Sequence, residues 1–142
     1  MQRLIAIILF IISLFTTGDM TKANVTAKNE IKSGDTSAVF VFENGTGKRI
    51  DGEIVVEDIE KEVFGQWVSI PFSQSFLESD KSEPVYPTEK RNLYVDFLST
   101  VSNIPIQIPI TSGSYRITVS FKTTGYRNVQ SGEVVSSFTV AS

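Results

Sequence analysis

A strict alternation of apolar and polar residues near the end of the chain sets the strongest limit on what it can fold into. In residues 112–122, SGSYRITVSFK, every second residue is large and apolar, namely Tyr115, Ile117, Val119 and Phe121. Successive side chains of a β-strand point to opposite faces of its sheet. The alternation therefore predicts a strand with one buried and one solvated face.

Most of the remaining chain reads as further short strands. Runs rich in Val, Ile, Thr, Phe and Tyr are separated by Gly, Asn, Asp, Ser and Pro, and no window shows the 3.6-residue apolar period of an amphipathic helix. These runs cover residues 26–31, 37–44, 50–59, 64–72, 93–97, 104–110 and 134–140. The pattern predicts an all-β domain, an antiparallel β-sandwich of about seven strands with Greek-key topology. A small β-barrel is the alternative.

Two residues at the start of the alternating strand narrow the type of sandwich. Gly113 allows the incoming chain to turn sharply. Tyr115 can bury its ring while its hydroxyl bonds to a backbone group of the preceding loop, as in the tyrosine corner of immunoglobulin-like domains. We therefore expect an immunoglobulin-like β-sandwich.

Two polar segments are expected to lie at the surface. The acidic cluster EDIEKE, residues 57–62, is interpreted as the solvated end of a hairpin. Residues 73–90 are the most polar part of the chain, and their two prolines interrupt any strand ladder, so we expect them to be loosely structured.

Two apolar segments have different expected places. Trp67 and Ile70 are large enough to anchor the core, and a lone tryptophan in a strand is more often a core residue than a ligand platform. In IPIQIPI, residues 104–110, Pro105 and Pro109 donate no backbone hydrogen bonds, so this run predicts an edge strand or an extended crossing.

The N-terminal segment has the features of an export signal. A basic start precedes an apolar run, residues 4–15, and a polar stretch then leads to a small-x-small sequence that ends at Ala23. The run is shorter than the roughly 20 residues of a membrane-spanning helix. We predict a secretory signal peptide over residues 1–23 and the immunoglobulin-like domain over residues 24–142. An uncleaved membrane anchor is the alternative.

The composition argues against most catalytic chemistry and against nucleic acid as a partner. The chain has no cysteine and no histidine, so it lacks the usual bases, thiol nucleophiles and zinc ligands. Its formal net charge is −3, and its cationic pairs, Lys48-Arg49 and Lys90-Arg91, are isolated. Nucleic acid and anionic lipid both require clustered Lys and Arg. We expect no catalytic residues, no metal site and no cofactor.

Several stretches of the sequence together resemble the small secreted bacterial immunoglobulin-like (Big-type) domain proteins. The stretches are SGDTSAVFVFEN, GQWVSIPF and SGSYRITVSF, which span most of residues 36–141. Gln66, Trp67, Ile70 and Pro71 match a Gly-x-Trp element followed by an apolar-Pro pair, and Gly113, Tyr115 and Arg116 match a late Gly-x-Tyr-Arg strand. The family resemblance implies an extracytoplasmic binding or structural module without established chemistry.

A loop near the C-terminus is the first candidate for a recognition surface. The predicted 123–131 hairpin connection exposes residue types that are favoured at interfaces, and the candidate interaction residues are Thr123, Thr124, Gly125, Tyr126 and Arg127. The Thr-Thr-Gly-aromatic sequence also resembles a loop of the chagasin-like cysteine-protease inhibitors, although the other motifs of those proteins are not found. An ordinary glycine turn explains the same residues.

The sequence predicts a non-enzymatic immunoglobulin-like domain that works outside the cytoplasm, secreted or associated with the cell envelope. It is expected to act as a binding or structural module for an unknown protein or envelope component. It would run as a monomer and contact a membrane only through an uncleaved N-terminal segment. Two alternatives are a secreted protease inhibitor that uses the 123–131 hairpin and an envelope assembly subunit whose edge strand is completed by a neighbour.

Overall fold

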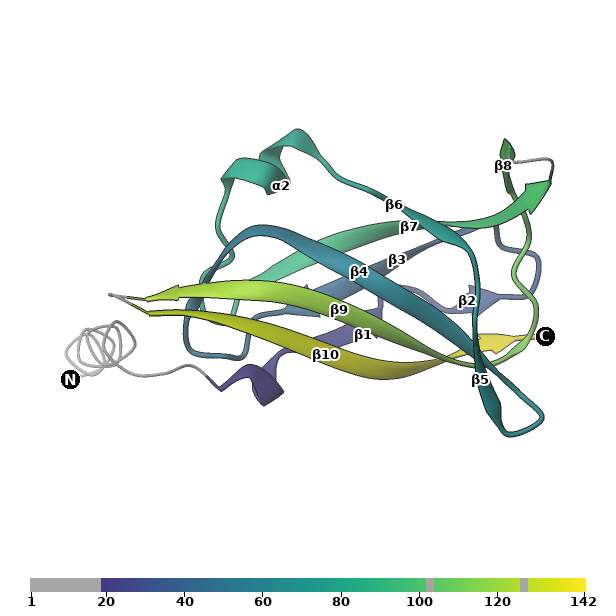
Figure 1. The fold of residues 1–142 in the computed structure, drawn as a ribbon, viewed down its shortest axis with the longest axis horizontal. Coiled ribbons are helices and arrows are strands. Elements are labelled where there is room, and N and C mark those ends of the chain that lie inside the picture. Colours follow the sequence, from purple (N-terminus) through teal and green to yellow (C-terminus); the bar gives the residue numbers. More distant parts are fainter. Residues whose placement is uncertain (1–18, 102–103, 126–127) are drawn as a thin grey trace.

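Two β-sheets pack face to face in a computed structural model that describes residues 19–101, 104–125 and 128–142 (Figure 1). The first sheet has the order β1 (Asn24–Ala27), β3 (Ser37–Glu43), β7 (Lys90–Val101) and β6 (Phe72–Ser75), with β8 (Ile104–Gln107) also paired to β7. The second has the order β2 (Ile31–Lys32), β10 (Asn128–Ala141), β9 (Gly113–Gly125), β4 (Arg49–Val63) and β5 (Gln66–Ser69). Two short helices, η1 (Met20–Lys22) and α2 (Glu78–Ser82), lie outside the sheets.

The strand order is that of an immunoglobulin-like sandwich, which confirms the predicted fold class. The chain crosses between the sheets after β1, β2, β3, β5 and β8, and β9 and β10 form a long hairpin within the second sheet. All pairings are antiparallel except that of β2 with β10. Such alternation between two antiparallel sheets is the arrangement expected of Greek-key sandwiches.

The described strands exceed the predicted number because two of the expected runs each divide into two strands. The run over residues 64–72 becomes β5 and β6, which belong to different sheets. Pro71 has no backbone N–H to give to a ladder, so the chain leaves the second sheet after Ser69 and joins the first at Phe72. The first predicted run likewise divides into β1 and β2, and β8 is the predicted edge strand at residues 104–107.

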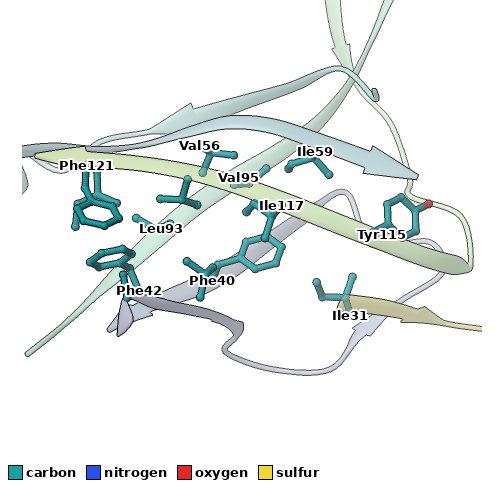
Figure 2. Close-up of a cluster of buried hydrophobic side chains, with 14 of the residues drawn as sticks. Ile31, Phe40, Phe42, Val56, Ile59, Leu93, Val95, Tyr115, Ile117 and Phe121 are labelled. Carbon is teal, nitrogen blue, oxygen red and sulfur yellow. The ribbon is translucent and has the colours of Figure 1, made fainter. Parts of the chain in front are cut away.

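Large apolar side chains from both sheets fill the space between them (Figure 2). The alternating strand contributes all four of its predicted inward residues, each at most 3% exposed. The Phe42 and Phe121 ring centroids lie 5.2 Å apart across the sheets, and the rings of Tyr115 and Phe138 stack at 5.3 Å. The largest buried side chains come from β3, β4, β7 and β9, and they include Phe40, Phe42, Ile59, Phe97, Tyr115 and Ile117.

Of two expectations about polar segments, one is confirmed in part and the other is wrong. Residues 57–62 lie in the last half of β4, and residues 60–62 pair with β5 next to the hairpin turn, as expected of a hairpin end. Residues 73–90 are not loosely structured, because they hold β6, α2 and a bridge between Ile50 and Val85. Val85 is buried in the core, which ties this connection to β4.

The two ends of the sandwich differ in what they carry. The turn between β4 and β5 and the strand β8 project at one end, whereas η1 and the last residues of β9 lie at the other (Figure 1). Ala23, directly after η1, is buried, and Met20 packs against the core. Among the residues that the structure describes, no helix combines the length and apolar character needed to cross a membrane.

Candidate functional site

The candidate interaction residues near the C-terminus lie mostly within a strand. Thr123, Thr124 and Gly125 belong to β9 and are paired with β10 up to Gly125 and Asn128. Thr123 is 2% exposed, and its hydroxyl donates to the backbone oxygen of Gln130 at 3.4 Å. Most of the predicted 123–131 connection is therefore part of the strands β9 and β10.

The other two candidate residues, Tyr126 and Arg127, lie outside the described residues. The recognition role predicted for the 123–127 segment stays a prediction, as does its role in a protease inhibitor.

The acidic residues of β4 make pairwise contacts with neighbouring strands. Glu57 accepts a hydrogen bond from the Ser120 hydroxyl at 2.6 Å, and Asp58 accepts one from the Ser69 hydroxyl at 3.2 Å. Glu60 pairs with Arg116 at 2.7 Å. In the described ranges, no three His, Cys, Asp or Glu residues are grouped to hold a metal ion.

An exposed apolar cluster forms the turn between β4 and β5. We call Val63, Phe64, Trp67 and Val68 the hairpin cluster; their side chains are exposed, and that of Phe64 is fully so. Phe64 has φ 50° and Gly65 has φ 78°, the positive values of a two-residue type I′ turn. Asn-Gly or Gly-Gly suits such a turn, and a bulky residue in the left-handed region is strained. In the sequence, Gly65 between two apolar runs indicates this turn. The prediction of a single strand over residues 64–72 instead placed Gly65 inside a strand.

Trp67 lies on the surface, and its predicted place in the core is therefore wrong. Its ring is 37% exposed and lies under the Arg116 guanidinium, whose central carbon is 4.4 Å from the ring centroid. The hydrogen bond from Arg116 to Glu60 raises the pKa of the guanidinium, so this cation stays charged. Stacking on a paired arginine holds the Trp67 ring at the surface instead of burying it. Ile70 does pack against the core, as predicted.

An apolar pocket of about 160 Å³ opens at the base of the same hairpin. Its walls include Ile70, Phe97, Leu98, Ile108 and Ile110, with Lys61, Thr111 and Tyr115 at one side. The Lys61 Nζ donates to the Thr111 hydroxyl at 2.7 Å and lies 5.7 Å from the Tyr115 ring centroid. The pocket thus combines apolar walls with one ammonium group.

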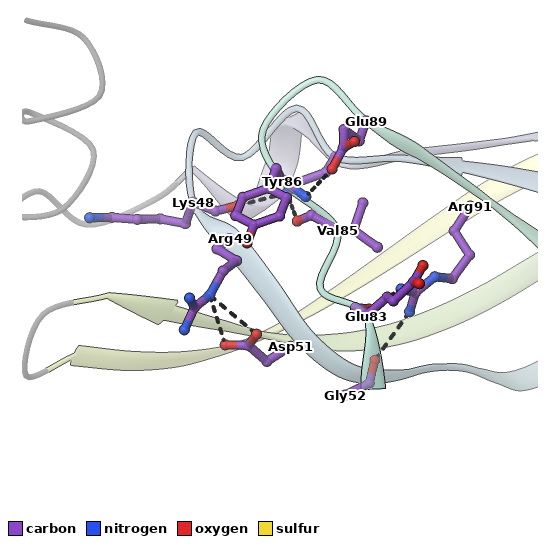
Figure 3. A network of polar contacts seen from close by, with 10 residues as sticks. Lys48, Arg49, Asp51, Gly52, Glu83, Val85, Tyr86, Glu89 and Arg91 are labelled. Atoms are coloured by element: carbon purple, nitrogen blue, oxygen red, sulfur yellow. Dashed lines mark hydrogen bonds and ion pairs between the residues drawn. The ribbon is translucent and has the colours of Figure 1, made fainter. Parts of the chain in front are cut away.

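A larger polar hollow of about 250 Å³ lies beside α2, with Arg91 in its wall. Arg91 is buried, and its guanidinium donates to the backbone oxygens of Gly52, Asp80 and Glu83 (Figure 3). Its Nε also lies 3.5 Å from the Asp80 carboxylate. These contacts hold the connection between β6 and β7 against β4, so Arg91 is a structural residue rather than a free anion-binding group.

The comparisons with known proteins add little to this geometry. No protein-family model matches the chain, and no curated protein matches it either. Among solved structures, the chain is similar to the ASH / PapD-like domain of human CEP192 (PapD-like domain 7), with a TM-score of 0.39 and 12% sequence identity over 90% of each chain.

Proposed function

We propose that this chain is a non-enzymatic immunoglobulin-like module that binds a protein or another envelope component outside the cytoplasm through its hairpin cluster. The observation that carries the proposal is Phe64. A fully exposed phenylalanine at φ 50° adds nothing to the core and holds a strained backbone. Strained backbone at a surface turn is a feature of binding sites, where contacts with a partner offset the free-energy cost of the strain.

The neighbours of Phe64 support a contact surface. Trp67 and Val68 are exposed on opposite faces of β5, and the Arg116–Glu60 pair borders the face that carries Trp67. Aromatic residues with an adjacent arginine are the residue types that contribute most at protein interfaces.

The position of the hairpin cluster fits a domain attached at its N-terminal end. The cluster lies at the end opposite η1 (Figure 1). If residues 1–23 remain as a membrane anchor, this end points away from the membrane. The absence of histidine and cysteine from the sequence supports a module without catalysis.

Site-specific photo-crosslinking tests the proposed surface. A photoreactive phenylalanine replaces Phe64 in the full-length chain in its own envelope, and a matched probe replaces Val135, an exposed residue of β10 outside the hairpin cluster. We expect discrete adducts from position 64 that are missing from position 135, and Trp67→Ala should reduce their yield. Identical adduct patterns at the two positions would rule out the hairpin cluster as the binding surface.

A second experiment tests the compartment. We expect fractionation to place the chain in the envelope or the culture medium, and N-terminal sequencing to show whether processing occurs after Ala23. A chain found only in the cytoplasm with its first residue intact would contradict the proposed location.

The assembly-subunit hypothesis has one observation in its favour. On the edge strand β8, Ile104 and Ile106 are exposed, and an exposed apolar edge can pair with another chain. Sizing chromatography separates the alternatives, since an assembly subunit elutes as concentration-dependent oligomers and the binding module as a monomer. Ile106→Lys should abolish any oligomer that forms through this edge.

A further inference from the structure

The apolar pocket at the base of the hairpin contains an ammonium group that the fold specifically accommodates. Lys61 has the same strand parity as Ile59, whose side chain is fully buried, so Lys61 follows it on the inner face of β4. Lysine at an inner-face position is uncommon, because its charge has to remain near water or a partner. Its side chain reaches the pocket that Ile70, Ile108 and Ile110 line.

Gly113 makes room for the stem of this lysine. A Cβ at residue 113 would lie 3.0 Å from the Lys61 Cε, tighter than most Cβ contacts, and the glycine has φ 146°. The predicted turn glycine of the sequence therefore has a second role, which is to let the lysine lie beside Tyr115. The Thr111 hydroxyl then fixes the ammonium at 2.7 Å.

Lys61 also differs from the two arginines that flank the sheets. Arg116 and Arg91 each have a carboxylate partner, Glu60 and Asp80 respectively. None of the ion pairs found within the described ranges includes Lys61, whose contacts are a neutral hydroxyl and an aromatic ring. Its positive charge is therefore available to an anion that enters the pocket.

We infer that this pocket binds a carboxylate that carries one ring-sized apolar group. An apolar cavity of roughly 150 Å³ holds one benzene molecule, and the pocket here is about 160 Å³. The apolar group occupies the space among the isoleucines, and the carboxylate accepts a hydrogen bond from the Lys61 Nζ. A free aromatic acid and the carboxyl terminus of a peptide ending in phenylalanine both present this chemistry.

This inference rests on the proposed function in one respect, since it names the chemistry of a ligand bound at the same end of the domain. The geometry itself is independent of the hairpin cluster. Phe64 follows Lys61 by three residue steps, about 10 Å along an extended chain, so a partner held by the cluster can also reach the pocket.

The test is a titration of the full-length chain, carrying ¹³C-labelled isoleucine methyl groups, with 3-phenylpropionate followed by NMR. Methyl signals of Ile70, Ile108 and Ile110 should shift together with a Kd of about 1 mM, the affinity expected of an acid of this size. The neutral 3-phenylpropanamide should bind about tenfold more weakly, and acetate should cause no shift at the same concentration. Equal binding of acid and amide, or no shift of these methyl groups, would overturn the inference.

Variants measure separately what the Lys61 ammonium and the apolar pocket contribute to binding. Lys61→Met should weaken binding of the acid to the level of the amide and leave the amide unchanged, while Lys61→Arg should retain the preference for the acid. Lys28→Met is the matched control, since Lys28 is exposed on a different part of the surface. Leu98→Trp fills the pocket and should abolish binding of both compounds. If Lys61→Met binds the acid as tightly as the unchanged chain, the ammonium has no role.

Titration with a peptide distinguishes a free aromatic acid from a peptide terminus as the ligand. Ala-Ala-Ala-Phe with a free carboxyl terminus should bind, and its amidated form should not. Tighter binding of the peptide than of 3-phenylpropionate identifies a peptide terminus, and weaker binding identifies a free acid. Failure of crosslinking at position 64 with intact acid binding would overturn the proposed function alone, and the reverse result would overturn this inference alone.

Discussion

The hydroxyl of Tyr115 shows how a single side chain joins a strand to the loop before it. Its ring is buried in the core (Figure 2). Its hydroxyl donates to the backbone oxygen of Thr111 at 2.6 Å. The tyrosine corner predicted from the sequence is thereby confirmed. The bond ties the start of β9 to the backbone of the loop before it.

Tyr115→Phe should lower the free energy of unfolding by about 1 kcal/mol, because it removes this hydrogen bond and keeps the ring. Urea denaturation of the variant and the unchanged chain measures the difference. Tyr94→Phe is a suitable control, since the Tyr94 hydroxyl has only a long 3.5 Å contact with Asn92. If Tyr94→Phe lowered the free energy of unfolding as much as Tyr115→Phe, the stabilising role assigned to the Tyr115 hydroxyl would be contradicted.

Phe64→Asn should raise the free energy of unfolding by about 1 kcal/mol. Asparagine tolerates the left-handed backbone of this turn, and Asn-Gly is the preferred sequence of a type I′ turn. The same variant should lose the partner contact proposed for Phe64, so stability and binding should change in opposite directions. An unchanged or lower denaturation midpoint would show that the turn is not strained.

At the scale of elements, the bulge in β4 decides which residues face inward. Val56 and Ile59 are both buried although three positions separate them, because the pairing with β9 shifts between Val56 and Asp58. Glu57 and Asp58, although consecutive in the chain, therefore both contact residues of the outer face. This one-residue shift also places Lys61 on the inner face, beside the pocket.

The connection between β6 and β7 is held by Arg91 in addition to the bridge between Ile50 and Val85. Arg91→Met should destabilise the domain by about 2–3 kcal/mol, because backbone oxygens of Gly52, Asp80 and Glu83 lose a buried donor. Thermal or urea unfolding measures this loss.

Arg91→Lys should recover little of the lost stability, since one ammonium cannot replace the planar fork of donors. Recovery to the stability of the unchanged chain would mean that charge alone is required. Lys90→Met is the neighbouring control, since Lys90 reaches Glu43 only at 4.0 Å on an exposed surface.

At the scale of the whole molecule, residues 19–23 pack onto the sandwich. The Asp19 N–H donates to the Thr46 oxygen at 3.0 Å, and Lys22 lies so close to Gly45 that a Cβ there would be 2.2 Å from the Lys22 oxygen. Met20 lies against Gly132, whose missing Cβ leaves space for the Phe121 ring and for the Met20 sulfur. A cleavage after Ala23, at the predicted boundary, would therefore remove residues that contact the domain.

A chain of residues 24–142 should be less stable than one of residues 19–142 by about 2 kcal/mol, since it loses the buried surface of Met20 and Ala23. Urea denaturation of the two fragments measures the difference. Met20→Ala in the longer fragment isolates the side-chain contribution and should account for about half of the loss. Equal midpoints for the two fragments would show that these contacts add nothing to stability.

The sequence by itself determined the features that depend on near neighbours in the chain. The alternation over residues 112–122 predicted β9 and its inward face, the prolines of residues 104–110 predicted the edge strand β8, and the sequence around Tyr115 predicted the corner. Each follows from the two-residue period of a strand or from the chemistry of one residue type, so a single sequence suffices.

Only the tertiary structure decided the features that depend on the partner strand. Neither the bulge in β4, the exposed turn at Phe64 and Gly65 nor the surface position of Trp67 follows from local pattern. Of these features, the bulge decides the candidate pocket, because it places Lys61 on the inner face. A shift of one residue in pairing turns every following side chain to the opposite face, and that shift is set by contacts with β9, which lies more than fifty residues further along the chain.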